Sequence, residues 1–285
     1  MLFRSELKAL ADGASHMYAR SGFDSNFTSY DYIAKVGESL GLIYGYEFDG
    51  VYQYDDFYTD TNGNLVLKPG ITQNSRYSKD KKVGARPGVT KYKDQDGDGD
   101  ITTNDRTVIG NAMPKWFGGI TNTFEYKGFD LSFMFQFNYG NDIYNATRLY
   151  ATQSRSGRRN MLAEVADRWS PTNASNVVPA YDGYITNDVY SRFVEDGSFL
   201  RLKNLTLGYT LPKKWTNKFH ASRLRVYATG QNLFCLSNYS GYDPEVNSLN
   251  NPMMPGLDWG AYPKSRVFTV GIDRSEEHTS ELQSH

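Results

Sequence analysis

The sequence is poor in the residues that metal-dependent and redox sites commonly use. Its single cysteine, Cys235, allows neither an intrachain disulfide nor a cysteine-ligated zinc site, and its four histidines are too few and too scattered for a metal cluster. No run approaches the roughly 18 consecutive apolar residues of a transmembrane helix. The formal net charge of −1 provides no polycationic surface, so we expect no nucleic-acid partner.

Catalytic motifs are absent as well. The sequence contains no Gly-x-Ser-x-Gly nucleophile elbow and no phosphate-binding loop. Carboxylate pairs such as Glu195 with Asp196, or Asp243 with Glu245, could be assigned to glycoside hydrolysis, but that chemistry needs a defined separation that the sequence does not show. Loop solvation or turn capping is the simpler interpretation, and we expect no enzyme.

Aromatic residues and glycine are plentiful, with 22 Tyr, 16 Phe and 26 Gly. This composition favours β-structure with many turns. Residues 129–139 have a strict period of two: the large apolar residues Phe129, Leu131, Phe133, Phe135, Phe137 and Tyr139 alternate with Asp130, Ser132, Met134, Gln136 and Asn138. A membrane-spanning strand needs about 9–11 residues, whereas strands of soluble proteins are usually nearer 5–6. The pattern therefore indicates a strand of a membrane β-barrel.

Residues 116–126 carry Ile120, Phe124 and Tyr126 on one parity. Lys127 and Gly128 separate them from the next strand and predict a tight hairpin turn, with Tyr126 and Phe129 on one face. A short helical turn is expected within residues 212–221. Further extended segments are predicted at residues 201–211, 224–232, 265–273, 32–36 and 40–52.

Long polar connections lie between these strands, roughly at residues 55–114, 140–194 and 235–264. They greatly exceed the connections of about 4–6 residues in compact domains. Membrane barrels place long loops outside the cell and short turns inside. In the second connection, residues 161–169 have helical apolar spacing and end just before Pro171, which predicts a short helix.

An acidic segment within the first connection matches the calcium-loop template. Asp94, Asp96 and Asp98 would supply side-chain oxygens, Asp100 a backbone carbonyl, and Asp105 the closing carboxylate. Asp has a shorter side chain than the usual closing Glu, and the flanking residues look extended rather than helical. The sequence is compatible with two interpretations of this segment, a structural Ca²⁺ site and a metal-free Asp/Gly-rich turn.

Aromatic residues in the long connections are candidates for contact with a substrate. For each of them, packing within the loop or a place in an interfacial aromatic girdle is an alternative role. The candidates are Trp169, Tyr181, Tyr184, Tyr239, Tyr242 and Trp259.

The two ends of the chain carry a matching signal. Residues 274–278, Arg-Ser-Glu-Glu-His, can be encoded by AGA TCG GAA GAG CAC, as in a short-read sequencing adapter. The reverse complement, GTG CTC TTC CGA TCT, reads Met-Leu-Phe-Arg-Ser when GTG is a start codon, and these are residues 1–5. We therefore interpret residues 1–5 and 274–285 as translated adapter and residues 6–273 as natural sequence. An ordinary polar tail is the alternative.

Motifs in a fixed order resemble the SusC/RagA family of TonB-linked outer-membrane proteins over nearly all of residues 6–273. Among them are Asp105-Arg-Thr-Val-Ile-Gly110 and Gly230-Gln-Asn-Leu-Phe234. The remaining motifs are residues 36–46, 49–52, 91–98, 126–132, 139–144, 196–209, 241–245 and 256–263. Each motif is weak alone, but the ordered set is specific.

The resemblance implies an all-β fold: the C-terminal part of an antiparallel membrane barrel of about 22 strands, with long extracellular loops. It also implies a location in the Gram-negative outer membrane, embedded in its lipid. The implied partners are a SusD-like surface lipoprotein and TonB, and the implied cargo is an oligosaccharide or a peptide. The TonB-contacting part would lie upstream, so we expect no transport by this chain alone.

One alternative comes from another class of protein. A secreted, calcium-stabilised β-sandwich that binds glycans would also carry an acidic loop and exposed aromatics. Strands of eleven residues with lipid-compatible faces argue against it.

Overall fold

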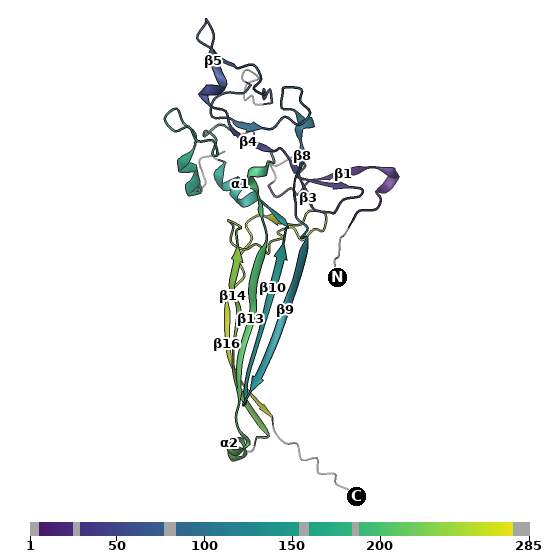
Figure 1. The fold of residues 1–285 in the computed structure, drawn as a ribbon, viewed down its shortest axis with the longest axis vertical. Helices are drawn as coiled ribbons and strands as arrows, with labels where there is room; N and C mark the ends of the chain where they lie inside the picture. Colours follow the sequence, from purple (N-terminus) through teal and green to yellow (C-terminus); the bar gives the residue numbers. More distant parts are fainter. Residues whose placement is uncertain are drawn as a thin grey trace. The chain divides into compact units, whose positions relative to one another are not determined.

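The computed structural model describes residues 6–24, 29–76, 84–153, 160–183, 188–219 and 221–275. These residues form two compact units (Figure 1). The sheet unit contains residues 115–139 and 198–238 and the chain from Tyr262 onward. The loop unit contains the residues up to Pro114, together with residues 140–197 and 239–261. The three long connections predicted from the sequence therefore fold mainly into the loop unit.

The sheet unit is one antiparallel sheet with the strand order β16-β14-β13-β10-β9. The five strands are those predicted from apolar alternation. Their bounds are β9 (Trp116–Tyr126), β10 (Phe129–Tyr139), β13 (Phe199–Thr210), β14 (Arg223–Ser237) and β16 (Val267–Ser275). β14 is longer than predicted, so the third connection begins after Ser237 rather than at Cys235. The helix α2 (Lys213–Thr216) and the 3-10 helix η6 (Asn217–Phe219) confirm the helical turn between β13 and β14.

Part of the segments attributed to adapter falls within this sheet. Arg274 and Ser275 are the last residues of β16 and pair with Leu224 and Arg223 of β14. Residues 1–5 and 276–285 lie outside the described residues.

A two-residue turn joins β9 to β10. Lys127 and Gly128 have φ values of 48° and 87°, which is the left-handed conformation that a type I′ hairpin turn requires. Tyr126 and Phe129 are direct cross-strand partners, so their side chains share one face as predicted.

The strand register separates two chemically different faces. Residues that are directly opposite one another in neighbouring strands share a face, so the pairing identifies each set. One face is apolar on all five strands and includes Ile120, Phe124, Phe133, Phe135, Leu205, Leu207, Val226, Val270 and Ile272. The other face is polar and includes Thr123, Ser132, Gln136, Thr206, Thr229 and Gln231.

A bulge preserves this separation along β13. Lys203 is the extra residue, because Leu202 and Asn204 on either side of it pair with consecutive residues of β10. The apolar positions of β13 change from even to odd numbers here, between Leu202 and Leu205. One unpaired residue returns both to the same face. The matching irregularity on β14 contains Asn232, whose φ is 52°.

The apolar face is exposed. Phe268, Val270 and Ile272 of β16 are 76%, 78% and 68% exposed, and Phe124 of β9 is 56% exposed. A β-sandwich covers such a face with a second sheet, whereas the described residues of the sheet unit form a single sheet. This observation argues against the β-sandwich alternative. An exposed apolar face opposite a polar one is the arrangement of a membrane-barrel wall.

The loop unit contains short strands in small sheets and several short helices. Its sheets have the orders β1-β2-β3-β8, β12-β11-β15, β4-β7 and β5-β6. The strands are β1 (His16–Ala19), β2 (Tyr32–Lys35), β3 (Leu42–Gly45), β4 (Phe48–Val51), β5 (Phe57–Thr59), β6 (Leu65–Leu67), β7 (Thr90–Tyr92), β8 (Thr107–Asn111), β11 (Asp142–Asn145), β12 (Val194–Asp196) and β15 (Leu257–Asp258). The helices are η1 (Ala11–Gly13), η2 (Tyr54–Asp56), η3 (Thr103–Asp105), α1 (Ala146–Thr152), η4 (Ala163–Asp167) and η5 (Ser191–Phe193).

The extended segment predicted at residues 40–52 is divided between two sheets. β3 ends at Gly45, and the backbone N–H of Tyr46 donates to the Val189 carbonyl at 2.8 Å before β4 begins. A Cβ atom at Gly45 would lie 2.3 Å from that carbonyl oxygen, so only glycine fits. The prediction of extended structure holds, but the chain changes partners in the middle of the segment.

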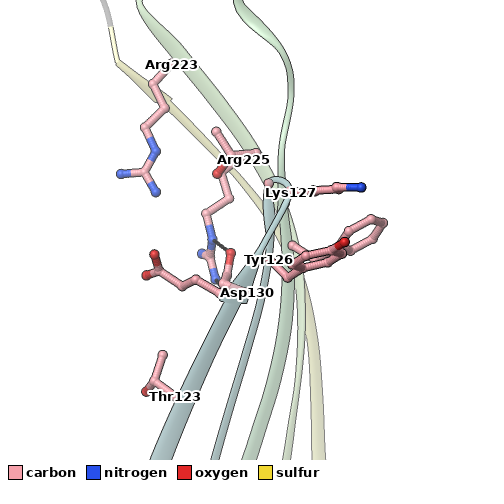
Figure 2. A pocket seen from close by; sticks show the side chains of 10 residues that line it. Thr123, Tyr126, Lys127, Asp130, Arg223 and Arg225 are labelled. Atoms are coloured by element: carbon pink, nitrogen blue, oxygen red, sulfur yellow. Dashed lines mark hydrogen bonds and ion pairs between the residues drawn. The ribbon is translucent and has the colours of Figure 1, made fainter.

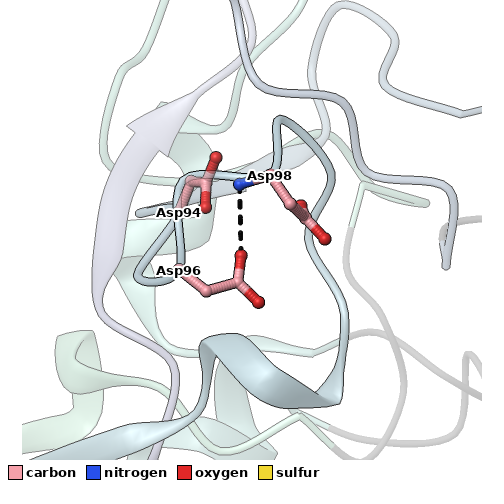
Figure 3. A group of neighbouring side chains, drawn as sticks. All are labelled: Asp94, Asp96 and Asp98. Carbon is pink, nitrogen blue, oxygen red and sulfur yellow. Dashed lines mark hydrogen bonds between the residues drawn. The ribbon is translucent and has the colours of Figure 1, made fainter.

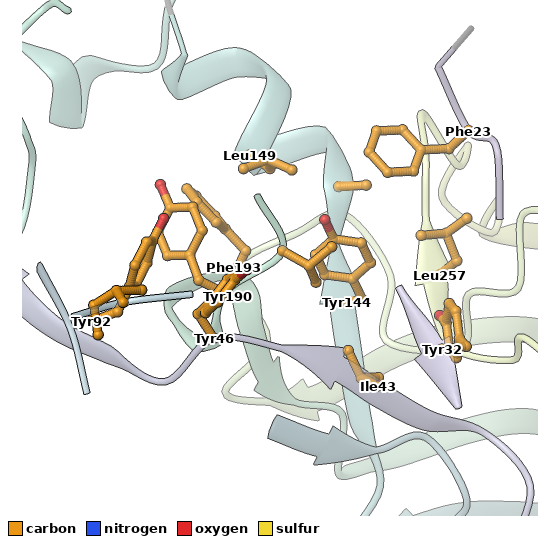
Figure 4. Close-up of a cluster of buried hydrophobic side chains, with 13 residues drawn as sticks. Phe23, Tyr32, Ile43, Tyr46, Tyr92, Tyr144, Leu149, Tyr190, Phe193 and Leu257 are labelled. Atoms are coloured by element: carbon orange, nitrogen blue, oxygen red, sulfur yellow. The ribbon is translucent and has the colours of Figure 1, made fainter. Parts of the chain in front are cut away.

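A core rich in tyrosine holds the loop unit together (Figure 4). The rings of Tyr46 and Tyr92 stack at 5.0 Å, and Tyr190 meets Tyr92 edge-on at 5.5 Å. Buried tyrosine hydroxyls need polar partners, and Tyr46 accepts a hydrogen bond from Arg76 at 2.7 Å. The core draws on all three connections and includes Phe23, Tyr32, Ile43, Ile101, Tyr144, Leu149, Phe193 and Leu257.

A short helix forms within residues 161–169, as predicted, but it is the 3-10 helix η4 and is shorter than the predicted range. Val165 and Trp169 are buried while Leu162 and Ala166 are exposed, so the apolar positions do not form one continuous buried stripe. The α-helix of this connection is α1, where the Asn145 side chain accepts a hydrogen bond from the Arg148 N–H at 2.8 Å.

Among the described residues, no helix is both long enough and apolar enough to cross a membrane.

Candidate functional site

The acidic loop follows β7 in the loop unit. Carboxylate oxygens of Asp94, Asp96 and Asp98 all lie within 4.8 Å of one another, as their sequence spacing predicted (Figure 3). Hydrogen bonds within the loop set its shape. The Asp94 carboxylate accepts from the N–H groups of Gly97 at 2.6 Å and Gly99 at 2.9 Å. The backbone hydrogen bond from Gly99 lowers the pKa of Asp94, which keeps this carboxyl group ionised.

The other two predicted ligands hold the loop backbone. Asp100 accepts hydrogen bonds from the Ser75 N–H at 2.8 Å and from the Ser75 hydroxyl. Asp105 is buried and accepts from the N–H groups of Gln95 at 2.8 Å and Thr102 at 2.7 Å. Its carboxylate therefore closes the loop by capping backbone donors. The three clustered carboxylates supply the hard oxygen atoms that Ca²⁺ prefers.

Two of the predicted substrate-contacting aromatics are buried. The Trp169 indole packs against Val51 and Ala180 and donates to the Gln53 side-chain oxygen at 2.9 Å. The Tyr239 hydroxyl donates to Asp258 at 2.5 Å. Burial raises the pKa of Tyr239, and the Asp258 carboxylate adds to that effect.

The remaining candidates differ in exposure. Trp259 is partly buried, with ring centroids 4.9 Å from Phe23 and 4.8 Å from Tyr150. Tyr181 and Tyr242 are exposed. Tyr184 lies outside the described residues.

A surface cluster of aromatic rings was not predicted from the sequence. The ring centroid of Tyr18 lies 5.5 Å from that of Tyr30 and 5.2 Å from that of Tyr44. The Arg106 guanidinium lies 4.6 Å from the Tyr44 ring centroid. The sequence offered no signal for this cluster, because its members come from separate short strands and loops.

Glu195, one of the carboxylates considered for hydrolysis, belongs to an ion network. It accepts hydrogen bonds from Arg148 at 3.1 Å and from the Ser240 N–H at 2.9 Å. Glu164 binds both Arg148 at 2.8 Å and Arg192 at 2.9 Å, and the hydrogen bond from Arg148 is the main reason why its pKa is lowered. This network joins separate segments of the loop unit.

The sheet unit has a charged hollow at its turn end (Figure 2). Arg225 donates to Asp130 at 2.8 and 2.5 Å and to Asp273 at 3.1 Å. Figure 2 shows Arg225 and Asp130 on one side of the sheet and Tyr126 on the other. The hollow therefore belongs to the polar face.

Comparisons with known proteins identify relatives, although no protein-family model matches the chain. A TonB-dependent receptor from Formosa agariphila is 37% identical over 246 residues, which are 85% of this chain and 22% of the relative. A second one from the same organism is 31% identical over 275 residues, covering 88% of this chain and 26% of the relative. The TonB-dependent receptor SusC from Bacteroides thetaiotaomicron is 33% identical over 190 residues, 66% of this chain and 18% of the relative.

Solved structures share the fold. The RagAB peptide transporter matches with a TM-score of 0.67 at 21% identity, over 96% of this chain and 26% of that chain. The RagAB peptide importer in its open-open state matches with a TM-score of 0.65 at 22% identity, over 95% and 25% of the two chains. The chain thus spans about a quarter of the length of the proteins it matches. On its motif order, its two-faced sheet and these identities, the chain belongs to the SusC/RagA family of TonB-dependent receptors.

Proposed function

We propose that the chain supplies part of the barrel wall and the outer loops of an importer in the Gram-negative outer membrane. The relatives are TonB-dependent receptors several times longer than this chain, so the activity belongs to a longer protein. In that protein the sheet unit meets lipid with its apolar face and the lumen with its polar face.

The two-faced sheet is the observation that carries this proposal. β9 and β10 each contain eleven residues, which matches the roughly 9–11 residues of a tilted membrane-spanning strand. Exposing this many aromatic and aliphatic side chains to water is unfavourable in free energy, whereas contact with lipid acyl chains avoids that penalty.

The import cargo is proposed from the relatives. RagAB is a peptide importer or transporter, and SusC is a TonB-dependent receptor. We infer that the complete protein imports oligosaccharides or peptides, with TonB supplying energy and a SusD-like surface lipoprotein covering the outer loops. Tyr181 and Tyr242 are exposed enough to meet cargo directly. Trp169, Tyr239 and Trp259 would act by positioning the loops around it.

We also propose that Asp94, Asp96 and Asp98 bind a structural Ca²⁺ ion. Three carboxylates this close repel one another, and a divalent cation removes that repulsion. The ion would hold the acidic loop in one conformation and take no part in catalysis.

Lipid contact can be tested with tryptophan reporters. The four native tryptophans are changed to Phe, and one Trp is then introduced at Phe133 on the apolar face or at Ser132 on the polar face. In vesicles with brominated acyl chains, we expect strong fluorescence quenching of Phe133→Trp and weak quenching of Ser132→Trp. Equal quenching at these neighbouring positions would contradict a membrane-spanning sheet. Import is tested separately, by uptake of labelled oligosaccharide or peptide through the complete receptor with and without TonB.

A further inference from the structure

Charge is unevenly distributed along the sheet unit. Residues 198–238 contain seven Lys and Arg residues and no Asp or Glu. Three of the cations, Lys213, Lys214 and Lys218, lie on α2 and η6, which join β13 to β14. Figure 1 shows α2 at one end of the long strands. We call these three lysines and Trp215 the basic turn end.

The lysines of the basic turn end are exposed, and in the part of the chain that the structure describes none of them forms an ion pair. The described sheet unit contains three acidic residues, Glu125, Asp130 and Asp273. Two of these carboxylates already bind Arg225 on the polar face. The positive charge of the basic turn end is therefore available to bind an anionic partner outside the sheet.

Aromatic side chains lie on α2 and at the β9–β10 turn, where the Thr210 N–H donates to the Gly128 carbonyl at 2.7 Å. Trp215 of α2 is 52% exposed. Tyr126 and Phe129, which flank the β9–β10 turn, are also exposed, and the Lys127 ammonium lies 5.1 Å from the Tyr126 ring centroid. Trp and Tyr favour the depth at which acyl chains meet headgroups, and lysine reaches from that depth toward phosphate.

We propose that the basic turn end binds the headgroups of anionic phospholipids. This inference rests on the proposed function, because the sheet must span the bilayer for α2 to reach headgroup depth. The short turns of a barrel face the periplasm, so the facing leaflet is one of phospholipids. Each lysine near an anionic surface strengthens binding about fivefold, and the three together about a hundredfold.

Vesicle flotation of the full chain tests this proposal. The vesicles are made of phosphatidylcholine alone or of phosphatidylcholine with phosphatidylglycerol. We expect the chain to bind both, through its apolar face, and to prefer phosphatidylglycerol vesicles by about a hundredfold at low salt, with the preference falling as salt is raised. The triple variant Lys213→Gln, Lys214→Gln, Lys218→Gln should lose the preference and keep its binding to phosphatidylcholine.

The matched control neutralises three exposed lysines of the loop unit, Lys8, Lys68 and Lys93. It should keep the full preference. The inference is overturned if wild type shows no preference, if the triple variant retains it, or if the control loses it equally. Binding of the wild type to neither kind of vesicle would instead overturn the membrane placement on which the inference rests.

Discussion

Asp130 of β10 and Arg225 of β14 form a two-point ion pair across a strand that separates them. The strand between them is β13, and its residue at the crossing point is Gly208. A Cβ atom at Gly208 would lie 2.4 Å from an Asp130 oxygen and 2.5 Å from an Arg225 nitrogen. The two charged groups therefore meet because residue 208 has no side chain.

Gly208→Val should separate this ion pair and crowd the polar face. We expect a loss of about 1–3 kcal/mol in the free energy of unfolding, measured by urea titration in lipid vesicles. Thr210→Val, on the same face of the same strand, is the control and should change little. Adding Asp130→Asn to Gly208→Val should cost little more, since the pair is already broken. A full additional loss would show that the pair survives the substitution.

The two faces of β10 should respond differently to charge. Phe133→Arg places a guanidinium among lipid-facing side chains and should destabilise the folded sheet by about 2–4 kcal/mol. Ser132→Arg, one residue away on the polar face, should cost much less. The comparison is made by urea titration of both variants in the same vesicles. Similar losses would argue that neither face meets lipid.

Deleting Lys203 should be far more harmful than replacing it. Without the bulge residue, either Leu202 and Leu200 or Leu205 and Leu207 must move to the polar face. We expect the deletion variant to lose the protease-resistant folded form in lipid vesicles, measured by limited proteolysis. Lys203→Ser keeps the residue count and should retain that form. A deletion variant that folds normally would contradict the bulge's role in setting the register.

Asp31 should make the loop unit less stable as pH rises. Its buried carboxylate accepts a hydrogen bond from the Ser21 N–H at 2.8 Å, yet burial raises its pKa to about 6. Because the folded state holds this proton more tightly than the unfolded chain, stability is greatest below about pH 4 and falls until about pH 6, by up to about 3 kcal/mol. Asp31→Asn removes the titrating group.

The measurement is thermal unfolding of the full chain between pH 4 and 7, followed by near-ultraviolet circular dichroism. The difference between wild type and Asp31→Asn should shrink as pH falls toward 4. Asp12→Asn, at an exposed position, should parallel wild type throughout. An Asp31→Asn curve that also parallels wild type would mean that Asp31 titrates normally.

Calcium should stabilise the chain through the acidic loop. Calorimetric titration should show Ca²⁺ binding that weakens at least about tenfold in Asp94→Asn with Asp98→Asn, because two charged ligands are lost. Asp100→Asn should bind nearly as well, since the predicted ligand at that position is its backbone carbonyl. Unfolding temperature should rise with Ca²⁺ in wild type and not in the double variant. If titration of the wild type with Ca²⁺ produced no heat of binding, the result would contradict the proposed Ca²⁺ site.

The parts of the fold that sequence predicted are those with a local pattern. Strict alternation predicted β10, apolar residues of one parity predicted β9, and Lys127 with Gly128 predicted the turn between them. The change of parity between Leu202 and Leu205 is visible in the sequence, but alternation alone does not say which residue is unpaired. The pairing of β13 with β10 determines that Lys203 is the unpaired residue.

The loop unit was not predicted as a compact unit, because its core has no local period. Tyr46, Tyr92 and Tyr190 lie in three separate segments of the chain and form a core only when those segments come together. The same reason explains the candidate sites. The spacing of Asp94, Asp96 and Asp98 is local and was readable, whereas the burial of Trp169 depends on Gln53, 116 residues away.

The loop unit is assembled from three stretches of chain with strands of the sheet between them. One of its hydrogen bonds joins the Tyr32 hydroxyl to the Pro255 carbonyl at 2.9 Å, across 223 positions in sequence. Contacts of such high sequence separation form slowly, because a long loop must close before they contribute. The tyrosine core of the loop unit cannot be completed until all three of these stretches of chain have reached the site of folding. We expect this unit to mature last during biogenesis, after the adjacent strand pairs have formed.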